Sequence, residues 1–149
     1  LDIDIVGFKS DPVQSIKPAN LFLHGYLDRA ESRNILARVD VGMGTLALHR
    51  KNMEEASPLK TREYLAYGIP IVLPYMDTDL KGLELDTILR IPNTEENIEQ
   101  NWNAVKAFAF LMAGKRVERN LITDHIDSAR KEDVRLEFFQ KHTRLGQIS

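Results

Sequence analysis

The sequence predicts an α/β fold: a Rossmann-like three-layer sandwich with a mostly parallel sheet. Two observations predict it. Short apolar segments alternate along the chain with longer amphipathic segments, as strands alternate with crossover helices. Most of the short segments are rich in apolar residues, as strands are when helices cover both faces of a sheet. The 149 residues, 43% of them hydrophobic, suffice for one domain with its own core over residues 1–149.

The first half of the chain is expected to form three strands around one helix. The predicted strands are short runs next to glycine: Asp2–Gly7, Leu21–His24 and Asp40–Leu48. Leu21–His24 is expected to be buried. The prolines of residues 8–20 leave little room for a helix between the first two strands. A helix is expected over Leu27–Val39, with Asp28 as its N-cap.

The second half is expected to form two strands and two long helices. The predicted strands are Ile69–Leu73 and Thr87–Ile91, and the predicted helices are Glu95–Met112 and Val117–Phe139. Apolar residues at spacings of three and four predict the buried face of the first of these helices: Ile98, Trp102, Val105, Phe108 and Leu111. The charged middle of the last helix is expected to face water.

A further helix is expected between these halves, over residues 58–67. Ser57 is suited to be its N-cap, and Pro58 suits the first helical position because the N–H that proline lacks would be unpaired there. Gly68 can adopt the left-handed conformation that ends a helix. A helix N-terminus favours phosphate. Glu55 lies just before this end, and Glu63 lies roughly 7–8 Å deeper along the helix at 1.5 Å per residue.

The stretch EASPLKTREYLAYGIPIVL, residues 55–73, resembles retaining glycosyltransferases of the GT-B fold, especially family 4. Their pattern is Glu, seven residues, Glu, a helix ending in Gly-x-Pro, and a hydrophobic strand. The earlier segments IVG, N-x-F-x-H-G-Y-L and V-D-V-G follow the order found in the C-terminal, donor-binding half of these enzymes. The resemblance implies that this chain is that half of a longer protein. The N-terminal acceptor domain would be absent, so the isolated domain would bind a nucleotide but hardly catalyse transfer.

The resemblance also implies roles for individual residues. Glu55 matches the catalytic glutamate near the transferred sugar, and Glu63 matches the glutamate that binds the ribose hydroxyls. Ser57, Pro58, Leu59 and Lys60 would bind the diphosphate. Gly25 and Tyr26 would lie near the nucleobase, and a plain strand-to-helix turn is the equal alternative for these two residues. Many members have glycine where Pro58 stands, and Pro58 has no N–H to donate. The basic pair that members carry near the start of this half has no counterpart here.

The expected donor is a UDP-, GDP- or ADP-sugar, with no metal or other cofactor. The expected acceptor is an unidentified glycan or lipid. The net charge of −2 gives no general attraction to nucleic acid. The chain has no cysteine, which excludes disulfides and suits a reducing compartment. The expected location is the cytoplasm, including the inner face of the membrane.

Two charged motifs remain open to more than one interpretation. The sequence Asp77-Thr78-Asp79 is the metal-binding pattern of another glycosyltransferase fold, but here a polar loop is favoured. The loop His49-Arg50-Lys51 could meet a donor phosphate or face water, and the second interpretation is favoured.

Two other function classes remain alternatives. A nucleotide-sugar epimerase on the same fold would use the same ligand without an acceptor. A non-catalytic Rossmann-like interaction module would bind no nucleotide-sugar. The sequence lacks a Gly-x-Gly-x-x-Gly after a strand, a Walker-type lysine loop and a Gly-x-Ser-x-Gly, which weakens dehydrogenase, ATPase and hydrolase interpretations.

Overall fold

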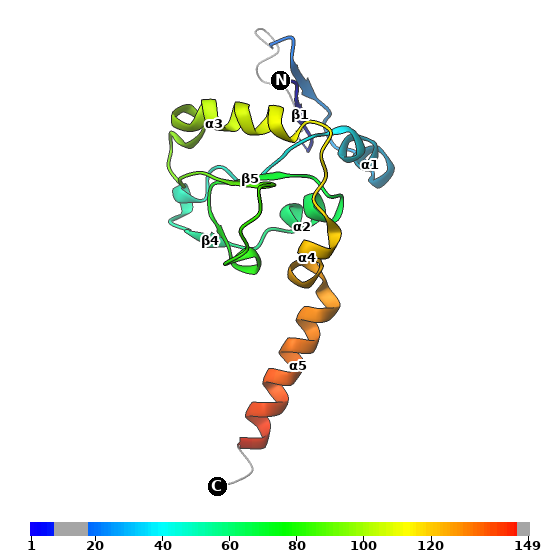
Figure 1. Cartoon of the computed structure of the whole chain (residues 1–149), viewed down its shortest axis with the longest axis vertical. Helices are drawn as coiled ribbons and strands as arrows, with labels where there is room; N and C mark the ends of the chain where they lie inside the picture. The colour runs from blue at the N-terminus through cyan, green and yellow to red at the C-terminus, as the bar shows by residue number, and fades with distance from the viewer. Residues whose placement is uncertain (8–17, 146–149) are drawn as a thin grey trace.

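The computed structural model describes residues 1–7 and 18–145 and has an α/β architecture (Figure 1). The strands are β1 Ile3–Ile5, β2 Leu21–Leu23, β3 Gly42–Met43, β4 Glu55–Ala56, β5 Ile71–Leu73, β6 Met76–Asp77 and β7 Ile88–Arg90. The α-helices are α1 Arg29–Arg38, α2 Leu59–Ala66, α3 Asn97–Met112, α4 Arg119–Ile126 and α5 Ser128–Leu145. Two short 3-10 helices are η1 His49–Lys51 and η2 Thr78–Leu80.

The described strands pair in parallel, as expected, but they form three small sheets. The orders are β1-β2, β3-β5-β7 and β4-β6. In the central sheet, Ile71 on β5 pairs with Gly42 on β3 and with Ile88 on β7. In the third sheet, Glu55 pairs with Met76. Neither β4 nor β6 is predicted by the sequence, and the strand predicted over Asp40–Leu48 is much longer than the two residues of β3.

The core packs against β5, whose three residues are all buried. Ile71 and Leu73 belong to a cluster with residues of α2 and α4, including Leu65 and Ile122. Val72 belongs to a second cluster, whose α3 members are Val105, Phe108 and Met112. The alternation of side chains along β5 therefore sends its residues into two different clusters. The prediction of a buried strand here is confirmed.

The helix ends confirm two signals read from the sequence. The side chain of Asp28 accepts a hydrogen bond from the Glu31 N–H at 2.8 Å, and Glu31 in turn accepts from the Asp28 N–H at 2.8 Å. This reciprocal pair is the capping box at the start of α1. Gly68 has a φ of +69°, which allows the chain to turn from α2 toward β5.

Three predictions about the packing and the helices are wrong. The region predicted as one helix from 117 to 139 is divided into α4 and α5 at Asp127, where the backbone is extended. Trp102 and Leu111 on α3 are 45% and 59% exposed, because α3 buries a narrower face than the apolar spacing indicated. Phe22 on β2 is 41% exposed, so this strand is not buried. The prediction that residues 8–20 leave little room for a helix falls mostly on residues 8–17, which lie outside the described residues.

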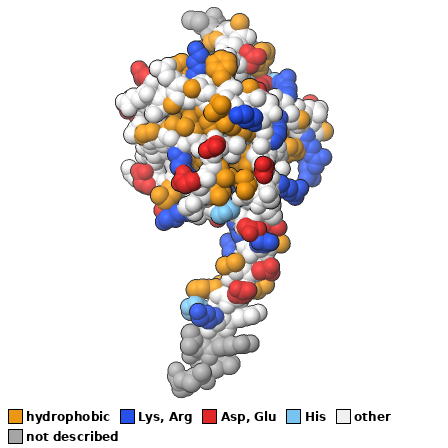
Figure 2. Space-filling model, in the orientation of Figure 1, with side chains coloured by type: hydrophobic (Ala, Val, Ile, Leu, Met, Phe, Trp, Pro, Cys, Tyr) orange, Lys and Arg blue, Asp and Glu red, His pale blue; other side chains and the backbone are white. Residues whose placement is uncertain are grey.

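Helix α5 extends away from the rest of the molecule (Figure 1). It carries exposed apolar side chains among its charges, and Figure 2 shows both kinds along its visible face. The exposed apolar side chains are Val134, Leu136, Phe138 and Phe139. Within the described residues, no helix has the length and apolar character needed to cross a bilayer.

Candidate functional site

The start of α2 is the centre of the candidate site. Pro58, not Ser57, is the N-cap: its backbone is extended, with φ −69° and ψ 140°, and the helix begins at Leu59. The Ser57 prediction is wrong because its hydroxyl is used elsewhere, donating a hydrogen bond to Asp79 Oδ2 at 2.6 Å. The N–H groups of Leu59 and Lys60 have no acceptor among the residues that the structure describes. They remain available to an anion.

Glu55 and Glu63 lie on different elements around this helix start. Glu55 is on β4 and Glu63 is inside α2, and both are exposed. Within the described part of the chain, neither carboxylate forms a hydrogen bond or an ion pair. Glu55 was expected just before the helix, and its backbone there is held by the β4–β6 ladder. Both glutamates are thus on fixed backbone with carboxylates open to a ligand.

A charged network lies beside the same helix start. The Arg62 guanidinium donates to both carboxylate oxygens of Asp77, each at 2.7 Å, and also to Asp79. Asp77 is fully buried, and the Arg62 side chain is 13% exposed. Arg62 NH1 also donates to the Pro58 carbonyl oxygen at 3.2 Å. A bidentate pair of this kind fixes geometry as well as charge, so Arg62 ties α2 to β6.

Asp79 accepts from three side chains through one oxygen. The donors to Oδ2 are Ser57, Arg62 and Lys131. Partial burial by itself would raise the pKa of Asp79, but hydrogen bonds from Lys131, Ser57 and Arg62 lower it to about 2. The two acidic residues of the Asp-x-Asp motif are therefore bound to cations of the protein. Among the described residues, no group of three or more His, Cys, Asp or Glu side chains is arranged to hold a metal ion.

The two side chains that begin α2, Leu59 and Lys60, differ in exposure and in charge. Leu59 is 86% exposed. Lys60 has no hydrogen-bond or ion-pair partner among the described residues. Its partial burial lowers its pKa. A cation that is partly removed from water and unpaired would gain from a bound phosphate.

Two of the three basic residues in the loop after β3, His49 and Arg50, are paired with one carboxylate. Arg50 donates to Glu95 at 2.8 Å through Nε, and His49 Nε2 lies 2.8 Å from the same carboxylate. Hydrogen bonds from Arg50 and His49 lower the pKa of Glu95 to about 2. Asn93 accepts from the His49 N–H at 3.2 Å, which joins this loop to the one after β7. The favoured interpretation of a solvated surface loop agrees with this ion pair.

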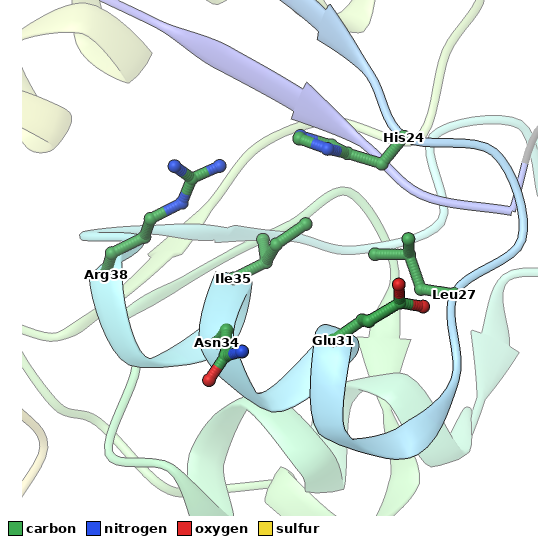
Figure 3. Close-up of a pocket in the computed structure, with 6 residues that line it drawn as sticks. All are labelled: His24, Leu27, Glu31, Asn34, Ile35 and Arg38. Atoms are coloured by element: carbon green, nitrogen blue, oxygen red, sulfur yellow. The ribbon is translucent and has the colours of Figure 1, made fainter.

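The turn of Gly25 and Tyr26 belongs to the β1–β2 sheet and not to the sheet beside α2. Gly25 has a φ of +66°. Figure 3 shows His24 and Leu27, which flank this turn, lining a shallow hollow of about 340 Å³ against α1. A role for this turn at the nucleobase stays a prediction.

His24 contributes to a polar contact between three elements. Its Nε2 lies 2.6 Å from Asp4 Oδ1, which also accepts from Arg38 at 2.8 Å. This contact joins β1, β2 and α1 at the edge of the hollow in Figure 3. Asp4 thus binds both His24 and Arg38, two of the polar side chains that line the hollow.

Arg62 and Lys131 were not predicted from the sequence. Arg62 is one position before Glu63, so it projects from a different side of α2, and no motif marks it. The spacing of Asp77 and Asp79 was noticed, but the cations that would bind them were not. Lys131 is 52 positions away from Asp79 along the chain. Only the folded structure brings these residues together.

Comparison of this chain with protein-family models, with curated proteins and with solved structures finds no significant match. The resemblance described above therefore rests on the motif residues themselves.

Proposed function

We propose that this chain is the donor-binding domain of a retaining glycosyltransferase that uses a nucleoside-diphosphate sugar. One observation carries the proposal. Two exposed carboxylates, Glu55 before α2 and Glu63 inside it, and the first N–H groups of α2 have no partner among the described residues. The layout suits a ligand with hydroxyl groups at both ends and a diphosphate between them.

Each group has a role in this proposal. The N–H groups of Leu59 and Lys60 and the Lys60 ammonium would stabilise the leaving diphosphate. Glu63 would accept hydrogen bonds from the ribose hydroxyls. Glu55 would position the sugar and favour the positive charge that develops at the anomeric carbon. The parallel α/β architecture is compatible with half of a GT-B fold, the finer assignment that we propose. The absence of cysteine suits the cytoplasm, where we expect the enzyme to act.

The test is a binding titration of the chain with UDP, GDP and ADP. We expect one of the three to bind selectively and Glu63→Ala to weaken that binding by at least about tenfold, the size of a lost charged hydrogen bond. Glu99→Ala, which removes an exposed glutamate from α3, is the matched control and is expected to bind like the wild type.

If Glu63→Ala and the wild type bound the nucleotide equally well, the nucleotide would not bind at α2. If the wild type bound none of the three nucleotides, the donor-domain proposal would be wrong and a non-catalytic module would be favoured. Product analysis with and without acceptor, using the full-length enzyme, separates transfer from epimerisation.

A further inference from the structure

Asp79 connects three elements through one carboxylate. Its Oδ2 accepts from Ser57, which directly precedes the N-cap of α2, and from Arg62 inside α2. The same oxygen accepts from Lys131, in the first turn of α5. The side chain of Asp79 is 22% exposed, so water screens these contacts only in part.

The backbone of Asp79 is fixed as well. The Asp79 carbonyl oxygen accepts from His125 Nδ1 at 2.8 Å, and the Asp79 N–H donates to Asp77 Oδ1 at 3.1 Å. His125 lies on α4, immediately before α5, and Asp77 is the buried partner of Arg62. If Asp79 moved together with α2, its hydrogen bonds to His125 on α4 and Lys131 on α5 would therefore be disturbed.

We propose, resting on the proposed function, that Asp79 is a positioning residue of the donor site and that Lys131 controls it from α5. Asp79 would touch neither the sugar nor the diphosphate; it acts through Ser57 and the start of α2. Lys131 has two effects. It holds Asp79 in the orientation that binds the Ser57 hydroxyl, and it balances a negative charge that would otherwise repel a diphosphate. The attachment of α5 thereby regulates how strongly the α2 start binds the diphosphate.

The experiment uses Lys131→Ala in the whole chain. We titrate UDP, GDP and ADP, and the corresponding monophosphates UMP, GMP and AMP, into each variant. We expect Lys131→Ala to weaken binding of the preferred diphosphate by about three- to tenfold. Binding of the corresponding monophosphate should weaken less, since the monophosphate presents less negative charge to Asp79. A loss of structure alone would weaken both by the same factor.

Two further variants sharpen the comparison. Lys131→Arg keeps the positive charge and should restore most of the affinity. Arg130→Ala is the matched control, because Arg130 pairs with the exposed Asp124 and not with Asp79. It should bind like the wild type. Thermal unfolding of each variant checks that the chains are folded at the titration temperature.

The outcomes separate this inference from the proposed function. Unchanged diphosphate affinity in Lys131→Ala, or an equal loss for diphosphate and monophosphate, would overturn the inference while leaving the Glu63 result intact. A wild type that binds no nucleotide would overturn both. Selective loss of the diphosphate, rescued by Lys131→Arg, would support the coupling between α5 and the α2 start.

Discussion

Gly42 determines how closely α2 approaches the central sheet. A Cβ placed on this residue would lie 2.4 Å from Cδ2 of Tyr64, and two more ring atoms would lie within 3 Å. The ring is rigid and belongs to the helix that carries Glu63. Only a residue without a side chain therefore lets α2 pack at this distance from β3.

Gly42→Ala is expected to lower the free energy of unfolding by about 1–3 kcal/mol, the usual cost of overpacking a core. Urea unfolding followed by circular dichroism measures the change. The same substitution in a Tyr64→Leu background should cost clearly less, because the ring is gone. An equal cost in both backgrounds would mean that the clash with Tyr64 is not the cause.

Arg62→Ala is expected to destabilise the chain by about 3–5 kcal/mol, because it leaves the buried carboxylate of Asp77 without its cation. Arg135→Ala on α5 is the control, since Arg135 pairs with Glu132 on an exposed surface and should change stability little. Urea unfolding of both variants makes the comparison. Similar stabilities of the two variants would contradict the prediction that Arg62 stabilises the buried carboxylate of Asp77.

At the scale of elements, local signals predicted some features and missed others. β5 was predictable because it is a continuous apolar run between Gly-x-Pro and Pro74. α1 was predictable from its capping residues. The β4–β6 ladder was not, because each strand has two residues and forms only when the loops meet. The helix break at Asp127 contains neither glycine nor proline. The sequence pattern therefore predicted one continuous helix across this position.

The capping box of α1 provides a test at this scale. Asp28→Ala should cost about 1 kcal/mol, the typical value of an N-cap. Asp28→Asn should retain most of the stability, because asparagine caps helices about as well as aspartate. Thermal unfolding of the three chains gives the ranking. An alanine variant as stable as the wild type would show that α1 is held by its packing and not by its cap.

At the scale of the whole molecule, only those residues of the candidate site that lie within one continuous segment of the chain could be predicted. Glu55 and Glu63 were found because they share a motif with a helix and a strand, all within 19 consecutive residues. The network around Asp79 was not found, because it joins positions 57, 62, 79 and 131. Contacts between distant segments depend on the packing of all the elements, which no local pattern specifies.

The stability of the molecule in acid should depend on Asp79. Its pKa in the folded chain is about 2, below its ordinary value of 3.8. A lowered pKa contributes stability that is present above pH 3.8 and is lost as the pH falls through about 2. Asp79→Asn should therefore unfold with less dependence on pH between about 4 and 2. Circular dichroism during acid titration measures this, and identical curves for variant and wild type would contradict it.

Trp102 has a practical consequence for these experiments. It is the only tryptophan in the chain, and it is half exposed on α3. The second core cluster, which contains the buried residues of α3, has no member from α2. The tryptophan fluorescence of the chain therefore reports on the surface of α3. A silent emission spectrum during a nucleotide titration would carry little information about α2, so calorimetry is the suitable detector for ligand binding here.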